Sequence, residues 1–80
     1  MRILLVEDEK ILSKSIKMIL ERAEYEVDTA YDGEEALEYA KTAIYDLMIL
    51  DVMMPGMNGL EMCRKIRESS NIPVIMLSAK

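Results

Sequence analysis

Residues 46–59 read DLMILDVMMPGMNG and carry the strongest structural pattern in the chain. Four apolar residues, 47–50, lead directly into the carboxylate of Asp51, and a loop that contains one proline and two glycines follows. A short apolar run bounded by turn residues is typical of a strand that is buried on both faces of a parallel sheet. The sequence therefore predicts a strand over 46–51 with Asp51 at its carboxyl end.

The composition limits the classes of protein to which the chain can belong. Its 80 residues form one domain at most, and an apolar fraction of 51% supports a packed core. Fifteen acidic against ten basic residues give a net charge of −5. This charge argues against nucleic-acid binding, because phosphate contacts need a basic surface. The single cysteine excludes an intrachain disulfide, and the absence of histidine excludes histidine-ligated metals and Ser-His-Asp catalysis. We expect a cytoplasmic protein without a signal peptide or membrane span.

Strand and helix patterns alternate along the whole chain. Besides 46–51, strands are expected over 2–6, 25–30 and 74–78, and helices over about 9–22 and after the capping sequences that begin at Asp32 and Asn58. The apolar positions of the three helices are Ile11, Leu12, Ile16, Ile19 and Leu20, then Ala36, Leu37, Ala40 and Ile44, then Met62, Cys63 and Ile66. Such alternation predicts an α/β fold, a parallel sheet with helices on its faces and right-handed crossovers.

Polar side chains follow three of the predicted strands. Glu7 and Asp8 follow the first strand, Asp51 ends the third and Ser78 ends the fourth. Because the carboxyl ends of parallel strands lie along one edge, these side chains converge if the three strands are neighbours. Close carboxylates repel each other unless a cation compensates them, and Mg²⁺ prefers oxygen ligands. A carboxylate beside Mg²⁺ can attack a phosphoryl group, so the pattern predicts an acidic Mg²⁺ pocket with a candidate nucleophile, Asp51.

Each of these residues also has a simpler interpretation when it is taken singly. Asp51 could be a helix cap or a surface charge, and Ser78 a strand-end hydroxyl. Glu7 and Asp8 could favour the positive end of the helix that follows them. The occurrence of all four residues at the ends of predicted neighbouring strands favours the metal site over four unrelated explanations.

The chain resembles the receiver domain of bacterial two-component response regulators. The matching segments are 3–9 (ILLVEDE), 31–37 (YDGEEAL), 46–59 and 73–79 (PVIMLSA). These motifs occur in order, at the right spacing, and span the whole chain. The resemblance implies one receiver domain over 1–80 with a flavodoxin-like, doubly wound sheet in strand order 2-1-3-4. The Val-Glu-Asp-Glu variant resembles regulators that carry a winged-helix DNA-binding domain after the receiver, which implies transcription regulation.

The resemblance also implies a role for each site residue. Asp51 would accept a phosphoryl group from a sensor histidine kinase. Asp8 would bind Mg²⁺ directly, Glu7 would bind it through water, and the backbone carbonyl of Met53 would be a third protein ligand. Ser78 would be the switch hydroxyl that binds the phosphoryl group. The domain would be a phosphoacceptor with slow self-dephosphorylation at most, and not an enzyme.

The chain departs from the family pattern at its end. The family has five strands and five helices, so the fifth strand, the last two helices and a phosphoryl-binding lysine are expected to be absent. Lys80 does not replace that lysine, because it lies only two residues past Ser78. We therefore expect slow phosphorylation. We also expect apolar side chains such as Ile11, Ile16 and Ile19 to be bare, and self-association to cover them.

Other functions compete with phosphotransfer. The main alternative is a truncated receiver that acts only as a self-associating or interaction module. An aspartyl-phosphate phosphatase needs a second aspartate two residues after its nucleophile, where this chain has Met53. A flavin-binding sheet needs a loop rich in Ser, Thr and Gly after the first strand, where this chain has Glu-Asp-Glu over 7–9.

Overall fold

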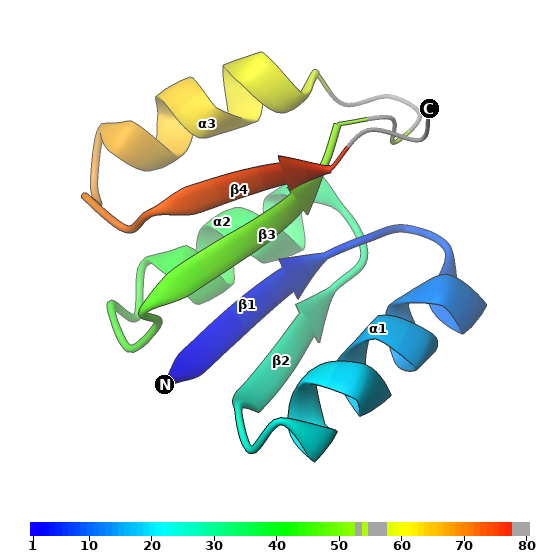
Figure 1. Ribbon diagram of the computed structural model, residues 1–80. Coiled ribbons are helices and arrows are strands. Elements are labelled where there is room, and N and C mark those ends of the chain that lie inside the picture. The colour runs from blue at the N-terminus through cyan, green and yellow to red at the C-terminus, as the bar shows by residue number, and fades with distance from the viewer. Residues whose placement is uncertain (53, 55–57, 78–80) are drawn as a thin grey trace.

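The structure, a computed structural model, describes residues 1–52, 54 and 58–77 and shows strands and helices in strict alternation (Figure 1). In chain order the elements are β1 (Arg2–Val6), α1 (Lys10–Arg22), β2 (Glu26–Ala30), α2 (Gly33–Ala40), β3 (Leu47–Asp51), α3 (Gly59–Arg67) and β4 (Val74–Leu77). The predicted order of elements is confirmed.

The four strands form one parallel sheet in the order β2-β1-β3-β4. The register pairs Val6 of β1 with Leu50 of β3, and Asp51 of β3 with Leu77 of β4. Helix α1 lies on one side of the sheet, and α2 and α3 lie on the other (Figure 1). The doubly wound arrangement and the strand order are confirmed. Because β1 and β3 are adjacent and parallel, their carboxyl ends lie side by side at one edge of the sheet.

Two apolar clusters hold these layers together. The larger one joins the sheet to α2 and α3 and contains Leu4, Val6, Met48, Leu50, Ala36, Met62 and Ile66 among its buried members. The smaller one lies under α1 and contains Ile3, Leu5, Val27 and Ile49. Alternate residues of β1 face opposite clusters, so this central strand is buried on both sides. Burial at such positions is worth about 1.5–3 kcal/mol for each large apolar side chain.

Helices α2 and α3 begin at the capping residues that the sequence predicted. The Asp32 carboxylate accepts a hydrogen bond from the Glu35 backbone N–H at 2.8 Å. The Glu35 carboxylate in turn accepts the backbone N–H of Tyr31 at 2.8 Å, one residue earlier than in the usual reciprocal box. Asn58 accepts the backbone N–H groups of two residues in the first turn of α3. These caps fix where each helix starts relative to the end of the preceding strand.

Helix α1 presents a different face to the sheet from the predicted one. Ser13 is its fully buried residue, and Ile16 and Leu20 pack against the smaller cluster. Ile11 and Ile19 are 79% and 65% exposed, so the prediction that they are bare is confirmed, whereas for the partly buried Ile16 it is wrong. The prediction of a broad buried stripe is also wrong. The residue that α1 buries fully is thus the small Ser13, while Ile11 and Ile19 lie on the solvent side of the helix.

Two further details concern the ends of α2 and of the sheet. Ile44 is 53% exposed because α2 ends at Ala40, so its predicted place on the apolar face is wrong. Strand β4 is an edge strand, and its Ile75, Met76 and Leu77 are exposed.

Within the described residues, no helix is long and apolar enough to cross a membrane.

Candidate metal centre at the carboxyl edge of the sheet

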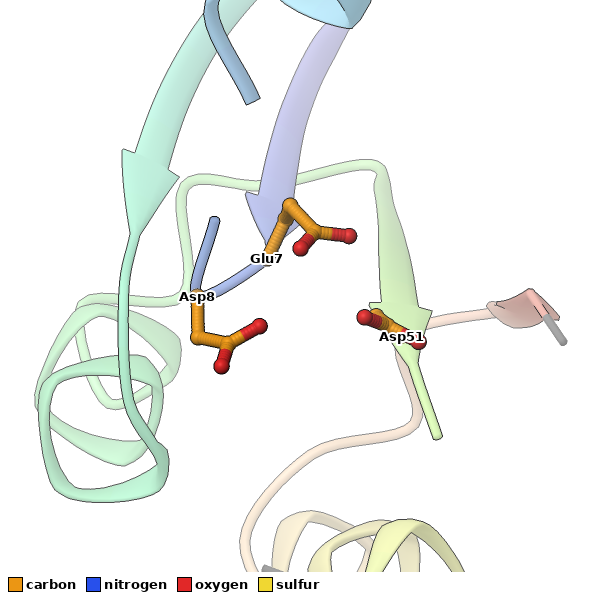
Figure 2. Close-up of side chains that lie close together, drawn as sticks. All are labelled: Glu7, Asp8 and Asp51. Atoms are coloured by element: carbon orange, nitrogen blue, oxygen red, sulfur yellow. The ribbon is translucent and has the colours of Figure 1, made fainter. Parts of the chain in front are cut away.

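Three carboxylates meet at the carboxyl edge of the sheet. Glu7, Asp8 and Asp51 each place one carboxylate oxygen within 4.8 Å of the others. Figure 2 shows Glu7 and Asp8, which follow β1, facing Asp51 at the end of β3. The pairing of Val6 with Leu50 makes Glu7 and Asp51 the next residues along two adjacent strands. The predicted convergence of these three side chains is therefore found in the structure.

Glu7 is the buried member of the cluster, with only 3% of its surface exposed. Its backbone N–H donates to the carbonyl of Ala30 at 3.0 Å, which continues the pairing of β1 with β2 beyond the end of the strand. Burial, together with the neighbouring Asp51 and Asp8, raises the pKa of Glu7 to about 7 against the lowering effect of a hydrogen bond from the Glu9 backbone N–H. At neutral pH this carboxyl group is therefore only partly ionised.

Asp51 and Asp8 are more accessible than Glu7. Asp51 is half-buried and Asp8 is exposed, so the cluster opens to solvent on one side. The residue after Asp51 is held firmly, because the Val52 N–H donates to the Leu77 carbonyl at 3.1 Å. A side chain on Gly59, the first residue of α3, would place its Cβ 2.7 Å from the Val52 side chain. Helix α3 therefore starts directly against the residue that follows Asp51, where only glycine fits.

The geometry and the donor set of the cluster fit a hard divalent cation. Mg²⁺ takes oxygen ligands at about 2.0–2.1 Å and retains several waters, so it can span this spread of oxygens directly or through one bound water. Within residues 1–52, 54 and 58–77, no lysine or arginine forms an ion pair with Glu7 or Asp8. A bound cation would favour the ionised form of Glu7 and so oppose the effects of burial and of the neighbouring carboxylates, which raise its pKa.

Two predicted site residues lie outside the described residues. They are Met53, whose backbone carbonyl was expected to bind the metal, and Ser78, the expected switch hydroxyl. Both stay predictions. The described part of the site thus consists of Glu7, Asp8 and Asp51 and the backbone that holds them.

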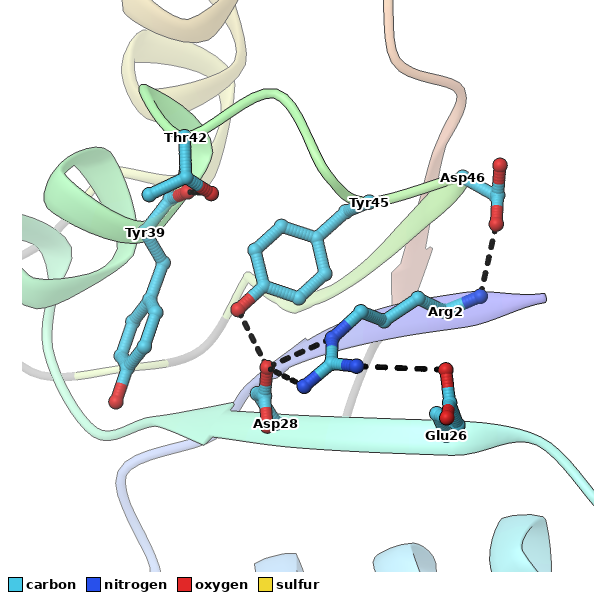
Figure 3. Close-up of polar contacts among 7 residues, drawn as sticks. All are labelled: Arg2, Glu26, Asp28, Tyr39, Thr42, Tyr45 and Asp46. Atoms are coloured by element: carbon cyan, nitrogen blue, oxygen red, sulfur yellow. Dashed lines mark hydrogen bonds and ion pairs between the residues drawn. The ribbon is translucent and has the colours of Figure 1, made fainter.

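Sequence reasoning missed a second polar cluster at the amino end of the sheet (Figure 3). The Arg2 guanidinium donates two hydrogen bonds to Asp28 at 3.1 Å and one to Glu26 at 3.3 Å. The Arg2 backbone N–H donates to Asp46 at 2.8 Å, and the Tyr45 hydroxyl donates to Asp28 at 2.7 Å. The charged residues of β2 were visible in the sequence, but their partners follow only from the register of β1 and β2.

These contacts change two pKa values in opposite directions. The Tyr45 hydroxyl, followed by the Arg2 guanidinium, lowers the pKa of Asp28 below its usual value against the effect of burial. Burial, followed by the Asp28 carboxylate, raises the pKa of Tyr45 to about 12. Asp28 is thus held ionised and Tyr45 is held neutral over the physiological range, as expected of a structural polar network.

Comparison with known proteins agrees with this geometry. The profile of the family described as "Response regulator receiver domain" matches residues 3–80. The response regulator ArlR of Staphylococcus aureus is 48% identical over 79 residues, which are 99% of this chain and 36% of ArlR. The chain therefore spans about a third of the length of this relative.

Two solved structures illustrate the structural likeness. Response regulator protein TrrA of Thermotoga maritima, crystallised in complex with Mg²⁺-BeF, is 44% identical with a TM-score of 0.91, and the match covers 99% of this chain and 70% of that one. A complex of histidine kinase ThkA with TrrA also matches, with 44% identity, a TM-score of 0.89, and coverage of 98% and 68% of the two chains.

Proposed function

This chain belongs to the response regulator receiver domain family, and on that premise we propose that Asp51 is a phosphoacceptor that takes a phosphoryl group from a sensor histidine kinase. The observation that supports the proposal is the convergence of Glu7, Asp8 and Asp51 within 4.8 Å at the carboxyl edge of a doubly wound sheet. A nucleophilic carboxylate beside two cation-binding carboxylates is the arrangement that phosphoryl transfer needs.

In the proposed reaction, a carboxylate oxygen of Asp51 attacks the phosphorus of a phosphohistidine. The new O–P bond forms as the P–N bond breaks, and the electron pair of that bond stays on the histidine nitrogen. Asp8 and Asp51 would hold Mg²⁺ directly and Glu7 through water, together with the backbone carbonyl of Met53. When bound, the cation would neutralise negative charge on the phosphoryl oxygens, and Ser78 would donate a hydrogen bond to one of them.

The rest of the assignment follows the same premise. We propose that residues 1–80 act as one receiver unit and as a phosphoacceptor rather than an enzyme, in a cytoplasmic regulator of transcription. The Mg²⁺-BeF complex of TrrA and the complex of TrrA with ThkA support the proposed cation and kinase partner. The net charge of −5 supports the proposal that this chain does not itself bind nucleic acid.

The experiment that tests the function is labelling with acetyl phosphate in the presence and absence of Mg²⁺. We expect the intact mass to increase by one phosphoryl group only with Mg²⁺, and Asp51→Asn to abolish the increase. Asp46→Asn is the matched control, because it makes the same change at the opposite end of the sheet and should be labelled normally. Labelling that persists in Asp51→Asn, or that is absent from the native chain while Mg²⁺ still binds, would contradict phosphotransfer at Asp51.

A second candidate function, self-association, is favoured by exposed apolar side chains. Ile11 and Ile19 of α1 are 79% and 65% exposed, and Ile75 of β4 is 49% exposed. Large bare apolar surfaces are uncommon in monomers, so we propose that copies of this chain associate through them. Sedimentation velocity over a range of concentrations tests this proposal, and a well-folded monomer at every concentration would refute it.

A further inference from the structure

A groove of about 460 Å³ lies between α2 and α3, beside the metal centre, with which it shares Asp8. Its floor is apolar and is formed by Leu37, Met54 and Met62, of which the two methionines are buried. Methionine side chains adapt their shape to different apolar partners. The volume lies within the range of protein ligand sites, about 300–1,000 Å³.

The rim of the groove carries an excess of negative charge. Asp32 and Glu34 at the start of α2 and Glu61 in the first turn of α3 line it, and Lys65 is the one cation among the described residues that line it. Asp8 also lines the groove, but the proposed metal would neutralise that carboxylate. Three acids and one base leave two negative charges in excess. An occupant therefore needs an apolar part for the floor and positive charge for the rim.

Lysine and arginine side chains combine these two properties. They bury an aliphatic stem along apolar surface while their charged head stays near water and carboxylates. We propose that the groove between α2 and α3 is a docking site for a partner protein segment in which basic residues flank an apolar one. The apolar residue and the aliphatic stems lie on the methionine floor, and the cationic heads reach Glu34 and Glu61.

This docking site does not depend on phosphotransfer, because none of the charged rim residues other than Asp8 belongs to the metal centre. It is tested on the Mg²⁺-loaded chain by following backbone amide resonances during titration with the peptide N-acetyl-Arg-Leu-Arg-amide. We expect saturable shifts centred on Gly33, Leu37 and Met62. The titration contains no phosphoryl donor, so its result does not depend on whether Asp51 accepts a phosphoryl group.

Two control peptides test separately whether binding needs the positive charge and whether it needs the apolar side chain. Replacing both arginines by citrulline keeps their shape and removes their charge, and replacing leucine by glycine removes the apolar anchor. From the usual worth of exposed ion pairs, we expect the citrulline peptide to bind about three- to tenfold more weakly. The glycine peptide should also bind several-fold more weakly. Equal binding of the arginine and citrulline peptides would overturn the proposal.

Variants of the chain locate the binding site. Glu34→Gln and Glu61→Gln should each weaken binding of the arginine peptide, whereas Glu38→Gln should not. Glu38 is an exposed acid of the same helix α2, but it does not line the groove. Equal weakening by all three variants would show a long-range effect of net charge, and absence of saturable shifts in the native chain would show that the groove binds no such segment. Either result would refute the proposal.

Discussion

Three carboxylates lie at each end of the sheet. Their surroundings shift the pKa of Asp28 at the amino end and the pKa of Glu7 at the carboxyl end in opposite directions. At the amino end, Tyr45 and Arg2 donate hydrogen bonds to Asp28 and lower its pKa. At the carboxyl end, the carboxylates face one another, and burial together with that proximity raises the pKa of Glu7 to about 7. The first cluster stabilises the folded chain, whereas ionisation of Glu7 in the second costs folding free energy.

The difference separates structural acids from functional ones. Where donors of the chain itself stabilise a carboxylate, as Arg2 and Tyr45 do for Asp28, a bound cation is not needed to stabilise its charge. Buried carboxyl groups with a raised pKa, such as Glu7, are expected at functional sites, where a ligand can favour the ionised form. The amino end thus serves as an internal reference, in the same sheet, for the acids at the carboxyl end, to which we assign Mg²⁺ binding and phosphoryl transfer as a proposal.

The largest expected effect is a loss of stability with rising pH that depends on Glu7. The pKa of Glu7 is about 7 in the folded chain and 4.5 as a free group, so the folded state binds more protons between these values. Its contribution is fully favourable below pH 4.5 and is lost as the pH rises through 7. We expect a loss of about 1–3 kcal/mol, where the upper figure is the full shift and the lower one allows for solvent screening.

Urea unfolding at a series of pH values measures this effect. The reference is Glu7→Gln, which keeps the shape of the side chain but cannot ionise and should lack this component of the pH dependence. Saturating Mg²⁺ should restore stability above pH 7, because the cation favours the ionised carboxylates. Parallel pH profiles of the native chain and Glu7→Gln would contradict the assigned pKa.

At the amino end, the largest effect is expected for Tyr45→Phe. This change removes the hydroxyl that donates to the ionised Asp28 at 2.7 Å and leaves the buried ring in place. A hydrogen bond to a charged group is worth about 1.5–3 kcal/mol, so we expect a loss of about 2 kcal/mol. The pKa of Asp28 should rise toward its usual value, as measured by its carboxyl resonance. A change in stability without a change in this pKa would attribute the loss to packing.

The same Asp→Asn substitution should have opposite signs at the two ends. Asp28→Asn removes a charge that Arg2 and Tyr45 compensate, and we expect a loss of about 1 kcal/mol. Asp51→Asn removes a charge that raises the pKa of Glu7, and we expect a gain of about 1 kcal/mol at pH 8 without Mg²⁺. Urea midpoints of both variants under one set of conditions give the comparison, which fails if the two changes have the same sign.

Much of the carboxyl end could be predicted from the sequence, because its signals are local. The apolar run before Asp51, the acids after the first strand and the helix caps at Asp32 and Asn58 each occupy a few consecutive residues. Parallel strands then bring their ends together whatever their exact register. The resemblance to receiver domains supplied the strand order, and with that order the convergence of Glu7 with Asp51 followed without any knowledge of side-chain packing.

The amino end could not be predicted, because its contacts depend on register and rotation. Arg2 meets Asp28 only because β1 pairs with β2 in one register, and a shift of one residue would turn Asp28 to the other face. The same limit explains the error in α1. Apolar residues lie around much of that helix, and close packing of the small Ser13 against the sheet determines which of them are buried.

The smallest expected effect is that of Arg2→Met, which tests how far the compensation at the amino end depends on charge alone. The Arg2 side chain is 35% exposed and its partner Glu26 is 72% exposed, so solvent and salt screen the pair. Methionine retains the apolar stem, and the Tyr45 hydroxyl still donates to Asp28. We expect a loss of stability smaller than that of Tyr45→Phe, visible at low ionic strength and absent near about 1 M salt, where screening extends over only about 3 Å. Urea midpoints at the two salt concentrations measure it.

A loss that persists at high salt would show that the directed hydrogen bonds of the guanidinium, rather than its charge, hold Asp28. The two ends of the sheet would then differ in hydrogen-bond donors more than in electrostatic compensation.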